Sequence, residues 1–348
     1  MSRTSSDERL RTGLCGLLAA AWLMAWPARA EPAAERRGAI LEVDEENDWF
    51  AGTDRHYTQG ARMVYLGAER SAERGWTAGW PAIVFRPAAV RWGAELGQSI
   101  YTPENLAARL PVNYDRPYAG WLYAGAVLQR RGTTAGGLPA WENIRLQLGV
   151  IGPASLAEAQ QELAHFIGGF QKAYGWANQL HNEPGLALKV QRAWRLAPWK
   201  GLAGNVDVIP PAGGSLGNVD TSLRAGALLR LGWRLPDDFG VQTIDSLALS
   251  AGGRSASAAD RNRSCYFFGG IEGRAVAYNA FLDGDLFQNS QSVDKRPFVF
   301  ELKTGLAIQW NRVDLAFSLV FRSEEFVGQN RWDDFGAIVL QWNFQGDR

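Results

Sequence analysis

Two groups of polar side chains have residue types that could do chemistry. The first pairs His165 with Gln161, four residues earlier in a segment of helical periodicity, so both side chains share one face of a helix. An imidazole can act as a general base, and an amide one turn away can position the reacting groups. A solvated surface histidine fits the same spacing, so these residues alone leave both interpretations open.

The second group is an acidic stretch followed by a polar one. Residues 44–48 read Asp-Glu-Glu-Asn-Asp, and residues 53–60 read Thr-Asp-Arg-His-Tyr-Thr-Gln-Gly. Carboxylate, amide and carbonyl oxygens are the ligands that a hard cation such as Ca²⁺ prefers. Their order does not match an EF-hand loop, and a solvated loop is the alternative. Residues 115–120, Asp-Arg-Pro-Tyr-Ala-Gly, indicate an ion-paired turn that enters a strand.

One motif imitates a serine hydrolase. Residues 213–217 match the Gly-x-Ser-x-Gly spelling, with Ser215 at its centre, but that nucleophile elbow needs a strand before it and a helix after it. A strand follows here, so we interpret the stretch as a loop. Asp283-Gly284-Asp285 likewise favours a turn over a metal site.

Composition limits the class of protein that can carry these groups. The chain has 348 residues with no net formal charge and 46% hydrophobic residues, which excludes a disordered protein. The 39 Gly and 15 Trp favour strands over a helical bundle. Two Cys and three His exclude a disulfide framework and leave little for structural zinc. Balanced charge argues against a general nucleic-acid binder.

The N-terminus has the order of a secretory signal. Three arginines within the first 11 residues precede the apolar stretch from Leu14 to Trp26, and Ala28-Arg29-Ala30 follows. This stretch is shorter than the roughly 20 residues that span a bilayer. We expect residues 1–30 to be a signal peptide cleaved after Ala30, and residues 31–348 to form a single domain.

The elements that must position the polar groups are strands. Residues 222–233 alternate between an apolar face and a face of polar or small residues, and residues 144–150 and 313–322 do the same. This alternation fits a soluble sandwich as well as an outer-membrane barrel. Strand lengths near ten residues and a final strand from Phe335 to Phe344 favour the barrel. Trp and Tyr also fall near strand ends, at Trp92, Tyr101, Trp121, Trp194, Trp233, Trp310 and Trp342.

The count of segments is even, as a bacterial barrel of this class requires. About twelve strands begin near residues 38, 57, 90, 119, 141, 186, 201, 221, 263, 298, 313 and 335. A helix with apolar positions at Leu156, Leu163, Ile167 and Phe170 is expected over residues 154–170, between the fifth and sixth strands. The sequence therefore predicts an all-β, antiparallel transmembrane barrel with one short helix.

At these residues the chain resembles the LpxR family of outer-membrane lipid A 3′-O-deacylases. The likeness covers essentially the whole mature chain and follows the family's order of motifs. Its motifs are Glu46-Asn47-Asp48 before Tyr57-Thr58-Gln59-Gly60, Tyr101-Thr102-Pro103 before residues 115–120, Gly152-Pro153 before Gln161 and His165, Trp176-Ala177-Asn178-Gln179-Leu180 with Asn182-Glu183, and Phe281-Leu282-Asp283-Gly284.

The resemblance implies a function and assigns roles by matched position. It implies a Ca²⁺-dependent hydrolase that removes the 3′ acyl or acyloxyacyl chain of lipid A in lipopolysaccharide, in the Gram-negative outer membrane. By the resemblance, Asp48 and Thr58 hold calcium, Asn47 belongs to the same site, His165 is the general base and Gln161 positions the reacting groups. We expect a monomer surrounded by outer-membrane lipids, with no nucleic-acid partner.

One position departs from the family, and two rival functions stay open. The family places a lysine shortly after Tyr-x-Pro, where this chain has Arg109, and a rigid guanidinium fork does not replace a flexible ammonium directly. The first rival is a non-enzymatic barrel, a channel or a structural protein. The second is a barrel phospholipase that acts through Ser215.

Overall fold

The structure is a computed structural model that describes residues 37–72, 85–196, 199–201, 204–241, 243–244 and 263–344. The expected signal peptide, residues 1–30, lies outside the described residues.

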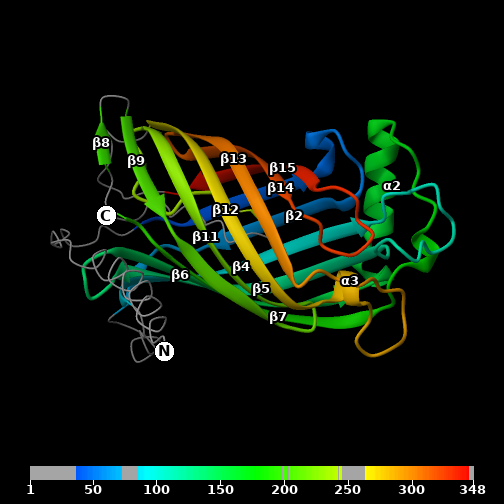
Figure 1. Cartoon of the computed structure of the whole chain (residues 1–348). Coiled ribbons are helices and arrows are strands. Elements are labelled where there is room, and N and C mark those ends of the chain that lie inside the picture. The colour runs from blue at the N-terminus through cyan, green and yellow to red at the C-terminus, as the bar shows by residue number, and fades with distance from the viewer. Residues whose placement is uncertain are drawn as a thin grey trace, which may run out of the picture.

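The described chain folds into an antiparallel sheet that closes on itself (Figure 1). Its strands are β1 (Ile40–Asn47), β2 (His56–Leu66), β3 (Arg70–Ser71), β4 (Arg86–Thr102), β5 (Ala119–Thr133), β6 (Pro139–Ile151), β7 (Glu183–Trp194), β8 (Trp199–Gly201), β9 (Gly204–Ile209), β10 (Pro211–Gly217), β11 (Asp220–Trp233), β12 (Arg263–Asn279), β13 (Phe298–Trp310), β14 (Val313–Arg322) and β15 (Asp333–Asn343). The pairings β1–β15 and β10–β11 close the ring. The sandwich alternative is therefore wrong.

Twelve strand positions, called staves here, make up the wall of this barrel in the described part of the chain. β9 and β10 are two halves of one stave, because Pro210 between them lacks the N–H that a ladder needs. β3 and β8 are short additions that pair with β4 and β9. Each stave corresponds to one predicted strand, so the predicted all-β barrel of twelve strands is confirmed.

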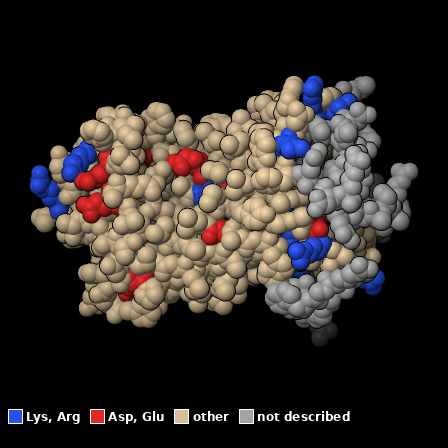
Figure 2. Space-filling model, turned by 180° about the vertical axis from the view of Figure 1, so that it is seen from behind, with Lys and Arg blue, Asp and Glu red and all other residues tan. Residues whose placement is uncertain are grey.

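The alternation of the strands separates an apolar outside from a polar inside. Along β11, Leu223, Leu229 and Leu231 are exposed on the outer wall, whereas Arg224 and Arg230 are buried inside. On the face seen in Figure 2, charged side chains gather mostly toward the two ends of the barrel. This distribution suits a wall that faces hydrocarbon.

Aromatic side chains mark one end of the wall. Trp92, Trp233, Trp310 and Trp342 are exposed, and the last three lie at the end opposite the helix α2, where β1 begins and β15 ends (Figure 1). Such a girdle is typical of a membrane interface. Two of the other predicted aromatic positions differ, because Tyr101 and Trp121 point into the barrel and are buried in its core.

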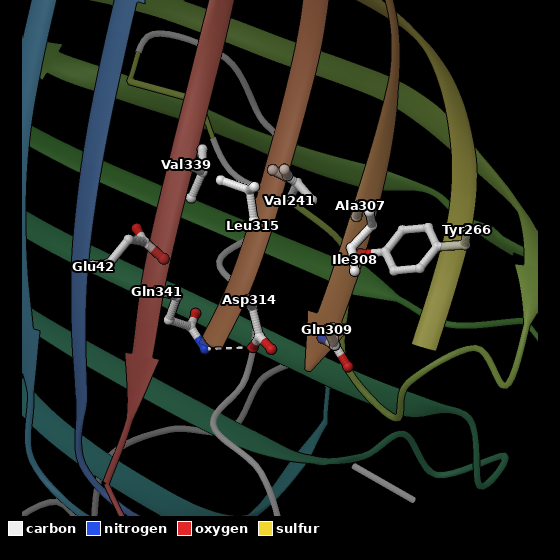
Figure 3. Close-up of a pocket in the computed structure, with 11 residues that line it drawn as sticks. Glu42, Val241, Tyr266, Ala307, Ile308, Gln309, Asp314, Leu315, Val339 and Gln341 are labelled. Atoms are coloured by element: carbon white, nitrogen blue, oxygen red, sulfur yellow. Dashed lines mark hydrogen bonds between the residues drawn. The ribbon is translucent and has the colours of Figure 1, made fainter. Parts of the chain in front are cut away.

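Ion pairs fill the lumen. Arg62 pairs with Asp44 at 2.5 Å, and Arg230 pairs with Asp207 at 2.7 Å. The run from Asp44 to Glu46 belongs to β1 and its two end residues are buried, so the solvated-loop interpretation of that stretch is wrong. Figure 3 shows a small pocket of this interior, where the Gln341 amide donates to Asp314 at 3.0 Å.

The chain after β11 also enters the lumen. Phe239 stacks on Trp141 of β6, and the Lys303 ammonium of β13 donates to the Thr243 hydroxyl at 3.0 Å. The next residue, Ile244, donates its backbone N–H to Glu46 at 2.6 Å. This segment therefore runs inside the barrel from the end where β11 stops toward the end where β1 stops.

Short helices gather at the end of the barrel opposite the aromatic girdle (Figure 1). They are η1 (Asp48–Ala51), η2 (Pro153–Ser155), α2 (Ala157–Gly168), η3 (Trp176–Asn178) and α3 (Ala280–Asp283). The predicted helix over residues 154–170 corresponds to η2 and α2, and it lies between the fifth and sixth staves as expected. No helix in the described ranges is both long and apolar enough to cross a membrane.

One local prediction was wrong. Residues 213–217 form part of strand β10, paired with β7 and β11, and not a loop. Small residues such as Gly213 and Gly214 are weak strand formers, and pairing on both sides overrides that preference.

Candidate active site

The two polar groups of the sequence meet at one end of the barrel. The turn η1 follows β1, and its Trp49 ring lies 5.8 Å from the ring of Phe170, just after α2. Asp54, between η1 and β2, approaches His165 of α2, with 3.8 Å between Oδ2 and Nε2. Segments more than a hundred residues apart in sequence therefore share one site.

The backbone fixes the tautomer of His165. Its Nδ1 lies 2.5 Å from the carbonyl oxygen of Gln171, which can only accept, so Nδ1 carries the hydrogen. The other nitrogen, Nε2, then has a free lone pair and faces Asp54. The ring packs edge-on against Phe170 and is mostly buried. An imidazole held in this way can accept a proton at Nε2.

Gln161 lies one turn before His165 and is buried. Its Oε1 accepts a hydrogen bond from the indole Nε1 of Trp176 in η3, at 2.7 Å. Its Nε2 is buried and has no partner among the described residues. Because a buried amide N–H is costly to leave unpaired, this group is available to a bound molecule or water.

The orientation of α2 corrects one interpretation. A solvated histidine on the polar face was one alternative, but His165 and Gln161 face the protein. Leu163 and Ile167 on the apolar face are exposed instead, together with Phe166. This inversion is expected where the surroundings of a helix are lipid rather than water.

Asn47 and Asp48 form the start of η1. The Asn47 side chain caps this turn by accepting from Trp49 N at 2.8 Å. Asp48 is buried, and its Oδ2 accepts from the backbone N–H of Arg55 at 2.5 Å. The turn is closed further by Thr53 N, which donates to the Asp48 carbonyl at 3.1 Å.

A β-bulge turns Thr58 toward the same place. In the β1–β2 pair Asn47 lies opposite Gln59, so the next residue, Asp48, lies at the level of Thr58. In the β2–β4 pair the register shifts at Thr58. A bulge re-aims a side chain, and Tyr57 and Thr58 are consecutively buried as a result. The Thr58 hydroxyl lies 2.8 Å from that of Thr102.

Three carboxylates surround this turn. Burial, together with the neighbouring acids Asp54 and Asp333, raises the pKa of Asp48 to about 9. Burial also raises the pKa of Asp54, which His165 opposes. Asp54 Oδ1 and Asp333 Oδ2 are buried without a partner in the described chain. Arg55 pairs with the other oxygen of Asp333 at 3.2 Å, so a cation would serve the two unpartnered oxygens.

The donor set limits how a cation could bind. Within the described residues, no three side chains of His, Cys, Asp or Glu converge as a metal cluster. Calcium takes six to eight oxygens, including amides, backbone carbonyls and waters. The side chains of Asn47, Asp48 and Thr58 fit such a mixed oxygen site, with most other ligands coming from the backbone or from water.

His56 and Arg109 lie near this site in different ways. His56 is buried at the start of β2 with a φ of 60°, and its Nδ1 lies 2.6 Å from Asp333 and its Nε2 3.4 Å from Asp115. The predicted ion-paired turn at Asp115-Arg116 is confirmed, since Arg116 also pairs with Glu325 at 3.4 Å. Arg109 is exposed, and its guanidinium lies over the Tyr174 ring at 4.9 Å.

Sequence reasoning missed three contributors. Asp54 lies within a motif, but the sequence assigned no role to it. The backbone carbonyl of Gln171 accepts from His165, and the Trp176 indole donates to Gln161, and neither contact was predicted. The acidic character of Asp54 was visible in the sequence. Its partner was not, because the pair forms only when α2 packs over the end of the barrel, on β4 and β5.

Comparison with known proteins identifies the family. A family model described as outer membrane protein LpxR matches residues 17–344. The chain belongs to the LpxR family. Among solved structures, LpxR from Salmonella typhimurium matches this family member with a TM-score of 0.68 and 22% identity, over 88% of this chain and 100% of that chain. This likeness supports the twelve-stranded outer-membrane barrel.

Other barrels are less similar to this LpxR family member. The beta domain of the Bordetella autotransporter BrkA matches with a TM-score of 0.39 and 11% identity, over 90% of this chain and 100% of that chain. A KdgM porin matches with a TM-score of 0.34 and 6% identity, over 88% and 99%. A search of curated proteins gave no match.

Proposed function

We propose that this LpxR family member is a calcium-dependent hydrolase that removes the 3′-linked acyl or acyloxyacyl chain from lipid A. The observation that carries the proposal is the state of His165. Its Nδ1–H is committed to the Gln171 carbonyl, and its Nε2 lone pair is left facing Asp54, on the helix face that also presents the unpartnered N–H of Gln161. This arrangement suits a base that activates water for attack on an ester.

The imidazole needs support once it has taken a proton. Asp54 Oδ2, 3.8 Å from Nε2, is close enough to stabilise the resulting imidazolium. Gln161 is held by Trp176 through its oxygen, so its free amide N–H can donate to the reacting ester or to the water. We assign it a positioning role.

The proposed metal site is formed by Asn47, Asp48 and Thr58. Calcium bound there would supply a positive charge that polarises the ester carbonyl and stabilises the oxyanion. The raised pKa of Asp48 and the unpartnered oxygens of Asp54 and Asp333 support a cation at this place.

The outer face of α2 suits an amphiphilic substrate. Leu163, Phe166 and Ile167 are exposed on the side of the helix opposite His165. Such a surface is stable next to acyl chains and costly in water. The site therefore lies at a boundary between a polar interior and lipid, where the headgroup ester of a lipid is found.

The rival functions are less consistent with the same features. Ser215 donates its hydroxyl to the Asp220 carbonyl at 3.0 Å and lies within a paired strand, so it lacks the geometry of a nucleophile elbow. A channel needs an open lumen, whereas this lumen contains ion pairs and the residues from Phe239 to Ile244, whose described members contact Trp141, Lys303 and Glu46.

The test is hydrolysis of lipid A by detergent-solubilised protein, with and without a chelator, followed by mass spectrometry of the products. We expect loss of the 3′ chain only when calcium is present. Unchanged lipid A under calcium-replete conditions, with a folded barrel, would favour the non-enzymatic barrel.

A further inference from the structure

The outer wall of the barrel contains a groove on strands other than those that α2 packs on. Its volume is about 780 Å³, within the range of about 300 to 1,000 Å³ that is usual for small-molecule pockets. It runs across β7, β10, β11 and β12 and ends at the start of β13, on the wall that faces the viewer in Figure 1. Its outward residues include Leu188, Gly214, Leu216, Leu223, Ala275 and Phe298.

The groove results from small residues between large ones. Gly214 and Ala275 both pair with Leu223, from the two strands that flank it, and Ala275 also pairs with Phe298. Leu216, Leu223 and Phe298 are exposed and project from the wall. Gly214 and Ala275 have little or no side chain, so the surface between the large side chains is recessed. The lining is therefore almost entirely apolar and has the width of a few strands.

The position of the groove along the barrel axis decides which leaflet of the membrane it faces. It lies next to the two-residue turn between β10 and β11, at the same end as α2. The girdle residues Trp233 and Trp310 lie at the opposite end of the same strands. In an outer-membrane barrel, longer loops face outward and short turns face the periplasm. The end that holds α2 has long connections over residues 103–118, 152–182 and 280–297, whereas residues 134–138 and 311–312 make short turns at the other end. The groove thus opens to the outer leaflet, where the available apolar ligand is an acyl chain.

A cation stands at the rim of the groove. Arg296 is exposed and directly precedes Pro297, which lines the groove at its upper edge. A guanidinium at the level of lipid headgroups attracts phosphate, and its stem can lie along apolar surface. The apolar groove matches the acyl chain of an anionic lipid, and the guanidinium of Arg296 at its edge matches the charged headgroup.

We propose that this groove is a binding site for one acyl chain of an anionic outer-leaflet lipid. The site is separate from the proposed catalytic site. The helix α2 packs on β4 and β5, and β7, the nearest strand of the groove, lies two strands beyond β5, roughly 10 Å away at about 4.8 Å per strand. The inference therefore goes beyond the proposed hydrolysis and holds whether or not the protein cleaves lipid A.

Photolabelling in a bilayer tests this directly. The full-length protein is placed in phosphatidylcholine nanodiscs that contain a small share of phosphatidylglycerol with a diazirine on its acyl chain. After irradiation, labelled peptides are mapped by mass spectrometry. We expect label concentrated in residues 211–223 and 275–298. The double variant Ala275→Leu and Ala277→Leu, which fills the groove, should reduce that label about tenfold.

Two controls make the result decisive. Ala94→Leu makes one substitution of the same kind at an exposed outward position of β4 and should leave the labelling unchanged. Arg296→Gln should remove the preference for the phosphatidylglycerol probe over a phosphatidylcholine probe with the same acyl chain. Label spread evenly around the wall, or equal labelling of the wild-type groove by both probes, would overturn the proposal. Protein–protein crosslinks through the same peptides without lipid label would assign the groove to a second copy.

Discussion

Replacing His165 by alanine is the sharpest test of the proposed chemistry. A general base contributes about 10²- to 10⁴-fold, which corresponds to about 2.7 to 5.4 kcal/mol of barrier. The cost to folding should be smaller, because the structure loses one hydrogen bond to the exposed Gln171, worth about 0.5 to 1.5 kcal/mol, and one ring contact with Phe170. We expect turnover on lipid A to fall at least a hundredfold while the barrel stays folded.

The assay measures fatty acid release in calcium-replete detergent, with folding checked by heat-modifiable gel mobility. His181→Ala is the matched control, because its Nδ1 is also held by an acceptor, Asp285 at 2.6 Å, and its ring is half exposed. It should retain near-normal turnover. If His165→Ala kept more than about a tenth of wild-type turnover, a loss of less than about 1.4 kcal/mol, the base assignment would be wrong even though the family is secure.

Further outcomes test the other assigned residues. Chelation should abolish fatty acid release and added calcium should restore it, whereas Asp48→Asn should respond only at much higher calcium. Because the pKa of Asp48 is raised to about 9, protons compete with the cation below that pH, and the apparent calcium affinity from activity titrations should rise up to about tenfold per unit between about pH 7 and 9. Gln161→Ala should lower turnover less than loss of the base does, since an amide transfers no proton. Ser215→Ala should leave turnover unchanged in the same assay. His56→Ala should lower the unfolding temperature, followed by circular dichroism, because it removes one hydrogen-bonding partner from each of the buried carboxylates Asp115 and Asp333, although Asp333 keeps its ion pair with Arg55.

The barrel itself was predictable from the sequence. Side chains of a strand alternate with period two, so residues such as Leu223 and Arg224 separate onto opposite faces whatever the register. The helix was also visible from its period of 3.6. Its orientation was not, because amphipathicity shows which residues share a face and not which face meets the protein. His165 is buried and the apolar face is exposed, which is the reverse of the arrangement expected for a helix in water.

The details of the site depended on pairings that sequence does not show. Thr58 is aimed inward by a bulge, and one residue of register shift cannot be inferred from β2 alone. The contact between Asp54 and His165 requires that α2 fold back over the end of β1 and β2. The charged pairs of the lumen, such as Arg62 with Asp44, likewise depend on which strands are neighbours.

The buried network of the barrel also explains how a turn at its rim can be held in place. Glu46, the second-to-last residue of β1, accepts from the Tyr57 hydroxyl at 2.6 Å and from the Ile244 backbone at 2.6 Å. Both partners lie inside the barrel, so the strand is fixed immediately before Asn47 and Asp48. Functional groups supported by rigid elements keep their geometry better than groups on free loops. The filled lumen, which argues against a channel, is in this sense the support of the proposed metal site.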